Sequence, residues 1–147
     1  MKTLKPILLV EDDLVDASTV KQALQDLRVK NPVVHKADGE EAIGYLREQV
    51  NQKPALILLD LNMPKISGVE FLQIIKADVR LQHVPVVVLT VSRYEQDKFD
   101  TFNLGVAGYV IKAVDYDEFL RAMDIIIRYW SWNGLVEKQK ETENARL

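Results

Sequence analysis

The sequence contains no cysteine and only two histidines, His35 and His83, among its 147 residues. Without cysteine the chain has no disulfide bond, no thiolate metal ligand and no cysteine nucleophile. Two histidines do not suffice for a multi-histidine metal site, and we expect each of them in a loop or at a sheet edge. If the chain binds a metal, oxygen ligands should hold it.

The sequence also lacks a long apolar run and an excess of basic residues. No stretch approaches the length of a membrane span, and residues 1–6 show no hydrophobic region of a signal peptide. The net charge of −3 and the pI near 5.4 argue against nonspecific nucleic-acid binding and against a basic membrane-binding surface. With 48% hydrophobic and 28% charged residues, the composition is typical of a soluble globular protein. We therefore expect one cytoplasmic domain with a core of its own.

Short aliphatic runs alternate with stretches of helical periodicity along the chain. Runs without polar alternation are typical of strands buried on both faces, as in a parallel sheet. The expected strands cover residues 7–10, 33–37, 56–60, 84–90 and 108–112. The expected helices start near residues 14, 38, 67, 92 and 115. This alternation predicts an α/β fold, a doubly wound parallel five-stranded sheet with five helices on its two faces and right-handed crossovers.

Several of the expected helices begin with a capping pattern, in which a Ser or Asp is followed three residues later by Glu. Two helices carry the serine version, Ser67 with Glu70 and Ser92 with Glu95. In this pattern the serine accepts a backbone hydrogen bond at the helix start. Both helices are therefore predicted to start at their serine.

Aromatic residues are concentrated in the fourth and fifth expected helices. The fourth helix should run to about Asn103, with Phe99 and Phe102 as its apolar anchors. In the fifth helix, apolar residues recur at helical spacing and form the predicted core stripe: Phe119, Met123, Ile126 and Trp130.

Three other residues of the last helix, Ile125, Tyr129 and Trp132, lie away from that stripe. Exposed apolar groups of this size usually mark an interface, so we expect a homodimer surface on this helix. Trp132 could instead make a contact within its own chain. The polar residues from Glu137 to Leu147 are expected to form a solvated tail.

Polar side chains end four of the expected strands. Glu11 and Asp12 follow the first strand, Asp60 ends the third, and Thr90 and Lys112 end the fourth and fifth. Since the carboxyl ends of parallel strands meet at one edge of the sheet, where open α/β sheets bind ligands, these side chains should lie together. Taken alone, Asp60 could be a solvated aspartate that caps the next helix. The joint occurrence of carboxylates, a hydroxyl and an ammonium at four strand ends favours a functional site.

The chemistry of this set is specific. Three crowded carboxylates repel one another unless a cation is present, and oxygen ligands favour a hard ion such as Mg²⁺. Lys112 adds a positive charge and Thr90 a hydroxyl donor. Such a set suits a tetrahedral dianion that is carried on one of the carboxylates. The pattern therefore predicts an aspartate, Asp60, that acts as a nucleophile towards a phosphoryl group.

The motifs at these strand ends resemble the receiver domain of two-component response regulators. They are LVED at 9–12, LLDLNMP at 58–64, VLT at 88–90 and GYVIK at 108–112, in the order and spacing of that family. The resemblance extends to about Trp130. It implies a flavodoxin-like sheet with strand order 2-1-3-4-5.

The same resemblance implies a single receiver domain over residues 1–147. Its core would span about residues 5–132, and its polar tail about 137–147. No DNA-binding or catalytic domain is expected to follow. The output would then be contact with another protein, competition for phosphoryl groups or dimerisation, and the sequence does not name the downstream target.

The resemblance also assigns the metal site. Asp12, Asp60 and the backbone carbonyl of Asn62 would bind Mg²⁺ directly, and Glu11 would act largely through water. Asp60 would be the phosphoacceptor, phosphorylated by a sensor histidine kinase.

Three further residues would respond to the phosphoryl group. Lys112 would pair with it, while Thr90 and Tyr109 would form the switch that reports phosphorylation. Tyr109 could also be an ordinary half-buried tyrosine of a strand.

The sequence departs from the receiver pattern at two places. Ala113 follows Lys112 where receivers usually have a proline in a cis peptide, and a cis bond without proline costs ~2.5–4 kcal/mol. Val91 stands where a small residue is usual, and would narrow the access to Asp60. The run 76–90 and the aromatic end of the last helix resemble stand-alone receivers that partner cyanobacterial phytochromes, which suggests a kinase of the phytochrome type.

Two functions of other classes remain open. A Mg²⁺-dependent phosphatase with an aspartyl-phosphate intermediate places a second aspartate two residues after the nucleophile as general acid, but Asn62 occupies that position. A flavodoxin-like nucleotide- or flavin-binding module needs a glycine-rich first turn, but the turn at Glu11, Asp12 and Asp13 has three acids that would repel a phosphate. We therefore expect a phosphoacceptor rather than an enzyme.

Overall fold

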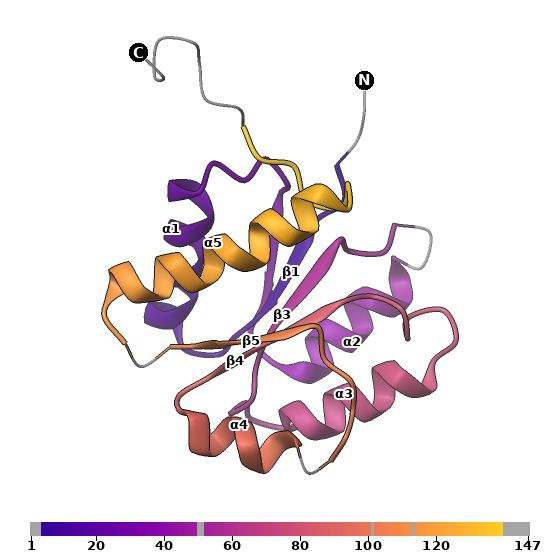
Figure 1. Ribbon diagram of the computed structural model, residues 1–147. Helices are drawn as coiled ribbons and strands as arrows, with labels where there is room; N and C mark the ends of the chain where they lie inside the picture. Colours follow the sequence, from indigo (N-terminus) through magenta and orange to yellow (C-terminus); the bar gives the residue numbers. More distant parts are fainter. Residues whose placement is uncertain (1–3, 50–51, 101, 113, 140–147) are drawn as a thin grey trace, which may run out of the picture.

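The computed structural model describes residues 4–49, 52–100, 102–112 and 114–139. Five strands form one parallel sheet in the order β2-β1-β3-β4-β5 (Figure 1). They are β1 (Ile7–Val10), β2 (Val33–Lys36), β3 (Leu56–Asp60), β4 (Val86–Thr90) and β5 (Gly108–Ile111). The predicted strand order is thus confirmed, and the order reverses between β1 and β3, where open sheets of this kind bind ligands.

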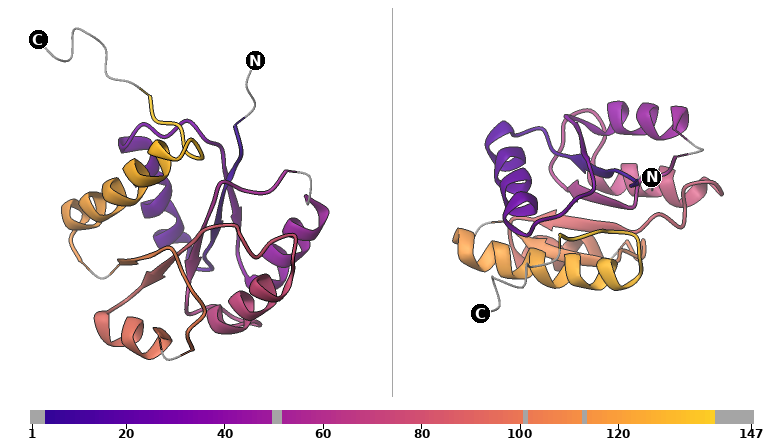
Figure 2. Two further views of the ribbon diagram at one scale, coloured as in Figure 1. Left: turned by 45° about the vertical axis from the view of Figure 1, so that its right-hand side comes forward. Right: turned by 90° about the horizontal axis from the view of Figure 1, so that it is seen from above.

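Five helices cover the two faces of the sheet, which makes three layers. They are α1 (Leu14–Asp26), α2 (Gly39–Glu48), α3 (Gly68–Ala77), α4 (Arg93–Asp100) and α5 (Tyr116–Trp132). Figures 1 and 2 show α1 and α5 on one face and α2 and α3 on the other, with α4 at the β4 end of that second face. In the described ranges, none of these helices has the length and hydrophobicity to cross a bilayer.

The sheet is buried on both faces because its central strands are aliphatic throughout. Along β1, Ile7 and Leu9 face the core under α1 and α5, while Leu8 and Val10 face the core under α2 and α3. All four are completely buried. Since a buried aliphatic side chain contributes roughly 1.5–3 kcal/mol, β1 and β3 form a rigid base for whatever follows their carboxyl ends.

The predicted helix starts are confirmed by their hydrogen bonds. Each N-cap side chain accepts the backbone N–H three residues on: Asp38 from Glu41 (2.9 Å), Ser67 from Glu70 (3.1 Å), Ser92 from Glu95 (3.1 Å) and Asp115 from Glu118 (2.9 Å). The cap of α1 was not predicted. Its N-cap Asp13 accepts from the backbone N–H groups of Val15 and Asp16.

The end of α4 differs from the prediction. The helix ends at Asp100, before Asn103, and Phe102 is 49% exposed whereas Phe99 is 4% exposed. Asn103 and Gly105 both adopt left-handed backbone conformations, with φ of 50° and 67°, which end a helix. The prediction that Phe102 is an apolar anchor of α4 was therefore wrong.

The expected tail also begins later than predicted. Val136 is buried, and Lys138 pairs with Val29 in an antiparallel bridge. The buried amide of Asn31 donates to the carbonyls of Lys5 (2.8 Å) and Leu135 (3.0 Å), and its oxygen accepts the Glu137 N–H at 2.7 Å. A solvated tail from residue 137 is therefore wrong for residues 137–139, and residues 140–147 lie outside the described part.

Candidate functional site: an acidic pocket at the sheet edge

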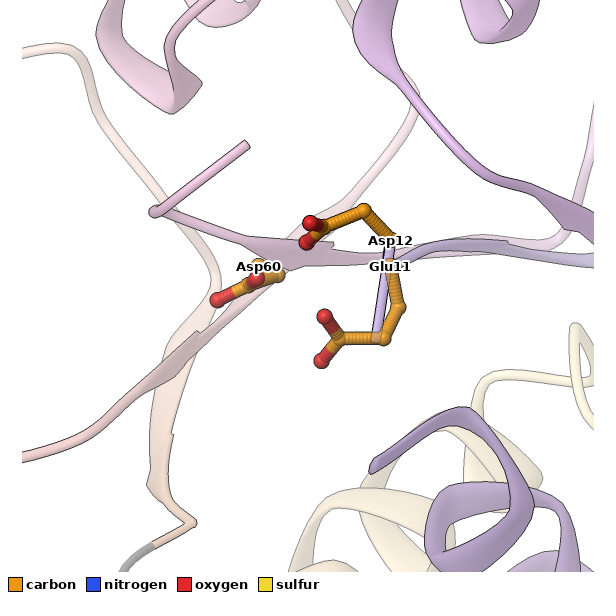
Figure 3. A group of neighbouring side chains, drawn as sticks. All are labelled: Glu11, Asp12 and Asp60. Atoms are coloured by element: carbon orange, nitrogen blue, oxygen red, sulfur yellow. The ribbon is translucent and has the colours of Figure 1, made fainter. Parts of the chain in front are cut away.

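Three carboxylates meet where β1 and β3 end. The two strands pair in register up to Val10 and Leu59, so the next residues, Glu11 and Asp60, lie side by side. Figure 3 shows the side chains of Glu11, Asp12 and Asp60 turned towards one region, and one carboxylate oxygen from each lies within 4.8 Å of the others. Glu11 and Asp60 are buried, while Asp12 is exposed. We call these three residues the acidic pocket; it is walled by the sheet and open to solvent at Asp12.

Lys112 brings a positive charge into this pocket from the end of β5. Its Nζ lies 2.8 Å from Glu11 Oε1 and 3.1 Å from Asp60 Oδ1, and the side chain is only 11% exposed. A third acceptor, Asp16 Oδ2 in the first turn of α1, lies 2.9 Å away. Asp16 was not predicted as a site residue.

The departure at Ala113 does not displace Lys112. The backbone N–H of Lys112 donates to the carbonyl of Thr90 at 2.7 Å, which holds it beside the end of β4. Ala113 itself lies outside the described residues, so the predicted strain of its peptide bond remains a prediction. The placement of the lysine therefore follows from strand pairing.

Burial controls the charges of the pocket. It raises the pKa of Glu11 to about 8, and the adjoining Asp60 carboxylate adds to that rise while Lys112 opposes it. Burial disfavours the charged form of Lys112 too, but its hydrogen bonds to Glu11 and Asp16 raise the pKa of the lysine overall. The pocket thus holds more negative groups than one ammonium neutralises.

The residues present fit a hard divalent cation. All three pocket ligands are carboxylates, without the nitrogen or sulfur donors that softer metals favour. Burial is the main cause of the raised pKa of Glu11, and the adjoining Asp60 carboxylate adds to it, so the charged form of Glu11 has a shortage of compensating positive charge. A cation entering from the exposed Asp12 side would relieve that shortage.

Thr90 ends β4 and is completely buried. Its hydroxyl donates to Glu95 Oε1 in α4 at 2.6 Å, with the carbonyl of Ser92 as a second acceptor at 3.1 Å. The other carboxylate oxygen, Glu95 Oε2, accepts from the side-chain amide of Asn62 at 2.7 Å. Glu95 was predicted only as part of a helix cap, and its link to Asn62 and Thr90 was missed.

The electrostatics of Glu95 follow from these contacts. Burial opposes its charge, but the hydrogen bonds from Thr90 and Asn62 outweigh burial and lower the pKa of Glu95 below its ordinary value. A carboxylate that is both charged and hydrogen-bonded thus joins the end of β4 to the loop after β3.

The remaining predicted residues lie around the pocket. The backbone N–H of Asn62 donates weakly to Asp60 Oδ1 at 3.4 Å, while the role of the Asn62 carbonyl as a metal ligand stays a prediction. Tyr109 in β5 is half-buried, its hydroxyl donates to Asp100 of α4, and its ring meets Phe99 edge-on at 6.2 Å. Burial and this hydrogen bond raise the pKa of Tyr109. Tyr109 therefore links β5 to α4.

A comparison with protein families matches residues 7–124 to the response regulator receiver domain. Among known proteins, the chain is 36% identical over 131 residues to the probable methanogenesis regulatory protein FilR2 of Methanothrix harundinacea, covering 86% of this chain and 84% of FilR2. It is 35% identical over 130 residues to the response regulator Rcp1 of Synechocystis, covering 86% of this chain and 88% of Rcp1.

Solved structures give the same result. The bacteriophytochrome response regulator AtBRR is 42% identical, with a TM-score of 0.73 over 83% of this chain and 91% of AtBRR. The phosphorylated cyanobacterial phytochrome response regulator RcpA is 37% identical, with a TM-score of 0.78 over 92% and 99%. The Mn²⁺-bound form of Rcp1 is 35% identical, with a TM-score of 0.73 over 86% and 94%. The resemblance to receivers, and to those of phytochrome systems, is confirmed.

Proposed function

Because this chain belongs to the response regulator receiver domain family, we propose that it is a single-domain response regulator of the cytoplasm that is phosphorylated on Asp60 with Mg²⁺ as cofactor. The observation that carries the proposal is the position of Asp60. It lies at the ligand-binding edge of the sheet, 3.1 Å from Lys112 Nζ and within 4.8 Å of two other carboxylates.

The proposed reaction is the transfer of a phosphoryl group from a phosphohistidine of a sensor kinase. A carboxylate oxygen of Asp60 forms the new bond to phosphorus as the bond from phosphorus to the histidine nitrogen breaks. Lys112 would stabilise the negative oxygens of the transferred group from its present position. Mg²⁺, held by Asp12, Asp60 and the carbonyl of Asn62 and largely through water by Glu11, would supply further positive charge to those oxygens.

The domain proposal rests on how the chain compares with its relatives. The matches to FilR2 and Rcp1 cover most of both proteins, in keeping with one receiver domain over residues 1–147. Within it, the ordered core would reach beyond residue 132, because Val136 is buried and residues 137–139 pair with the segment after α1.

The start of α1 offers a surface for the kinase. Leu14 and Val15 are 73% and 74% exposed, and they line an open groove with Tyr116 of α5. The groove lies beside the pocket, because Asp16 in the same turn bonds Lys112. Exposed apolar groups next to the reacting carboxylate would suit docking of a histidine-bearing helix. The similarity to AtBRR and RcpA supports a kinase of the phytochrome type.

The outer face of α5 offers a second surface, for a homodimer or a downstream protein. Ile125, Tyr129 and Trp132 are 70%, 60% and 93% exposed, whereas Met123 and Ile127 on the inner face are buried. An apolar face of this size usually marks an interface. Sedimentation velocity of the Trp132→Ala and Tyr129→Ala variants tests the dimer, which is refuted if the unmodified chain stays monomeric with and without beryllofluoride, an aspartyl-phosphate mimic.

Intact mass after incubation with acetyl phosphate tests the function. We expect the mass of one phosphoryl group, which disappears in Asp60→Asn and when EDTA removes Mg²⁺. Asp78→Asn is a matched control, because Asp78 caps the far end of α3 and pairs with Arg80. A gain that survives Asp60→Asn, or that ignores EDTA, refutes the proposal.

A second measurement, the hydrolysis of a phosphate ester over time, separates the chain from an enzyme. A phosphatase would hydrolyse a phosphate ester with steady turnover, which requires an acid for the leaving group. Asn62 carries no such proton, and its amide is already bonded to Glu95. We propose a phosphoacceptor with slow self-dephosphorylation only. The acids of the first turn, Glu11, Asp12 and Asp13, argue likewise against a flavin or nucleotide ligand.

A further inference from the structure

We infer that Glu95 is a positioning residue that withholds the Thr90 hydroxyl from the phosphorylation site, and that phosphorylation of Asp60 must break the bond between them. The inference rests on the proposed phosphorylation of Asp60. It assigns to Glu95 a role that its place in a helix cap does not require.

The Thr90 hydroxyl donates its proton to Glu95. A threonine hydroxyl has one proton to donate, and this proton is directed at Glu95 Oε1 at 2.6 Å. The second acceptor, the carbonyl of Ser92 at 3.1 Å, lies on the same side, at the start of α4. The hydroxyl therefore has no proton left for a phosphoryl oxygen on Asp60 while it is bonded to Glu95.

The hydrogen bond from Thr90 to Glu95 is strong. A hydroxyl that donates to a carboxylate forms one of the stronger hydrogen bonds in proteins, and distances of 2.5–2.7 Å are typical of this class. Thr90 is completely buried, so water does not offer it an alternative partner. The carboxylate is held from its other side by the Asn62 amide at 2.7 Å and at Oε1 by the Val91 N–H at 3.2 Å. Glu95 is thus fixed in the orientation that captures Thr90.

The position of Asn62 connects this arrangement to the reacting residue. Its backbone N–H donates to Asp60 Oδ1 at 3.4 Å, while its side chain reaches Glu95. A change in the loop after β3 on phosphorylation would act on Glu95 directly. Release of Glu95 would free the proton of Thr90 and remove a restraint on the start of α4 at the same time.

Binding of beryllofluoride in the presence of Mg²⁺ tests the inference on the full chain. Removing a bond that exists only in the unmodified state favours the modified state. Glu95→Ala should therefore lower the beryllofluoride Kd about tenfold, the change expected for one charge-assisted hydrogen bond. Glu95→Gln keeps the shape but not the charge, and should lower the Kd by a smaller factor of about three.

Glu70→Ala is the matched control, because Glu70 has the same position in the cap of α3 as Glu95 has in the cap of α4. The bonds of Glu70 to Ser67 belong to that cap. The Kd of Glu70→Ala should equal that of the unmodified chain. In a Thr90→Ala background, Glu95→Ala should change the Kd by less than about twofold, because the bond to be broken is already gone.

The outcomes separate this inference from the proposed function. If the unmodified chain does not bind beryllofluoride, or if Asp60→Asn still binds it, the proposed function fails. If binding needs Asp60 but Glu95→Ala and Glu95→Gln leave the Kd unchanged or raise it, the inference is overturned. An equal gain in the Thr90→Ala background also overturns it, since Glu95 would then act by charge repulsion alone. Thermal unfolding of each variant verifies that it is folded.

Discussion

The helices α3 and α4 start with the same pattern, a serine followed three residues later by glutamate, and they use it differently. In both, the serine accepts the glutamate N–H at 3.1 Å. In α3 the carboxylate of Glu70 returns to its own cap, where it accepts from Ser67 Oγ at 3.3 Å. In α4 the carboxylate of Glu95 leaves the cap and binds Thr90 and Asn62. One start is a part of the scaffold, and the other is connected to the acidic pocket.

Loop length explains the difference. Residues 61–67 separate β3 from α3, so Glu70 lies many residues after the carboxyl end of β3. Only residues 91–92 separate β4 from α4, which places the first turn of α4 at the edge where Thr90 ends. The same local pattern thus acquires a connection to the site only where the loop is short.

The largest test of this contrast removes the cation of the pocket. Lys112→Met leaves Glu11 and Asp60 buried without their ammonium, and should destabilise the metal-free chain at pH 8 by about 3 kcal/mol, as expected for a broken buried ion pair. Urea unfolding without metal measures it. Phosphoryl uptake from acetyl phosphate should also fall, by about a hundredfold.

A lysine near the start of α3 gives the control for that test. Lys65 pairs with Asp38 at 3.2 Å but is 56% exposed, so Lys65→Met should cost about 1 kcal/mol or less. Equal losses of unfolding free energy in Lys112→Met and Lys65→Met would show that the buried ion pairs of the acidic pocket stabilise the chain no more than a surface pair. The contrast between the pocket and the start of α3 would then fail.

Metal binding gives the next largest effect. Mg²⁺ at a hundredfold excess over its Kd should stabilise the chain by ~2.7 kcal/mol, because it binds only the folded pocket. Asp12→Asn should reduce that gain and raise the metal-free stability, because one of three crowded carboxylates loses its charge. Thermal unfolding with and without Mg²⁺ measures both. A metal-free Asp12→Asn variant that melts below the unmodified chain would contradict the clustering of these charges.

The pH dependence of stability gives the third effect. The pKa of Glu11 is raised from 4.5 to about 8 in the folded chain, so the folded state holds this proton more tightly than the unfolded state. The resulting stabilisation is complete below pH 4.5 and is lost as the pH rises to 8. The free energy of unfolding without metal should therefore decline from pH 5 to 8.

Glu11→Gln is the control for the pH effect, because it keeps the shape of the neutral acid and removes its titration. The unmodified chain and this variant share all other titrating groups, including both histidines. The difference between their two curves should therefore isolate Glu11. Parallel curves would mean that burial does not raise its pKa.

The fold could be predicted because its signals are local and repeated. The aliphatic runs of β1 and β3 show no polar alternation, as expected for strands buried on both faces. The approach of Asp60 to Lys112 followed from their places at the ends of parallel strands. The exposed face of α5 followed from helical spacing, with Trp132 at 93% exposure.

The partners of Glu95 and Asp16 could not be predicted. Each lies in the first turn of a helix, where an acid is already explained by the cap and by the positive end of the helix. Which partner such an acid binds also depends on the orientation of the helix, and spacing along the chain does not determine that orientation. The pairing of residues 137–139 was missed for a related reason, since the buried Asn31 that anchors Glu137 is more than 100 residues away in sequence.

The smallest effect compares the two serine caps themselves. Ser67→Ala and Ser92→Ala each remove one N-cap hydrogen bond of 3.1 Å, and each should destabilise the chain by about 1 kcal/mol. Their effects on the site should differ, because Ser92 also offers its carbonyl to Thr90 at 3.1 Å and orients the turn that carries Glu95. A more mobile turn weakens the hydrogen bond from Thr90 to Glu95, so Ser92→Ala should lower the beryllofluoride Kd about twofold. Ser67→Ala should leave the Kd unchanged. Urea unfolding and the Kd are measured on the same preparations. If both variants change the Kd equally, the start of α4 has no special connection to the acidic pocket. The different contacts of Glu70 and Glu95 would then have no effect on beryllofluoride binding.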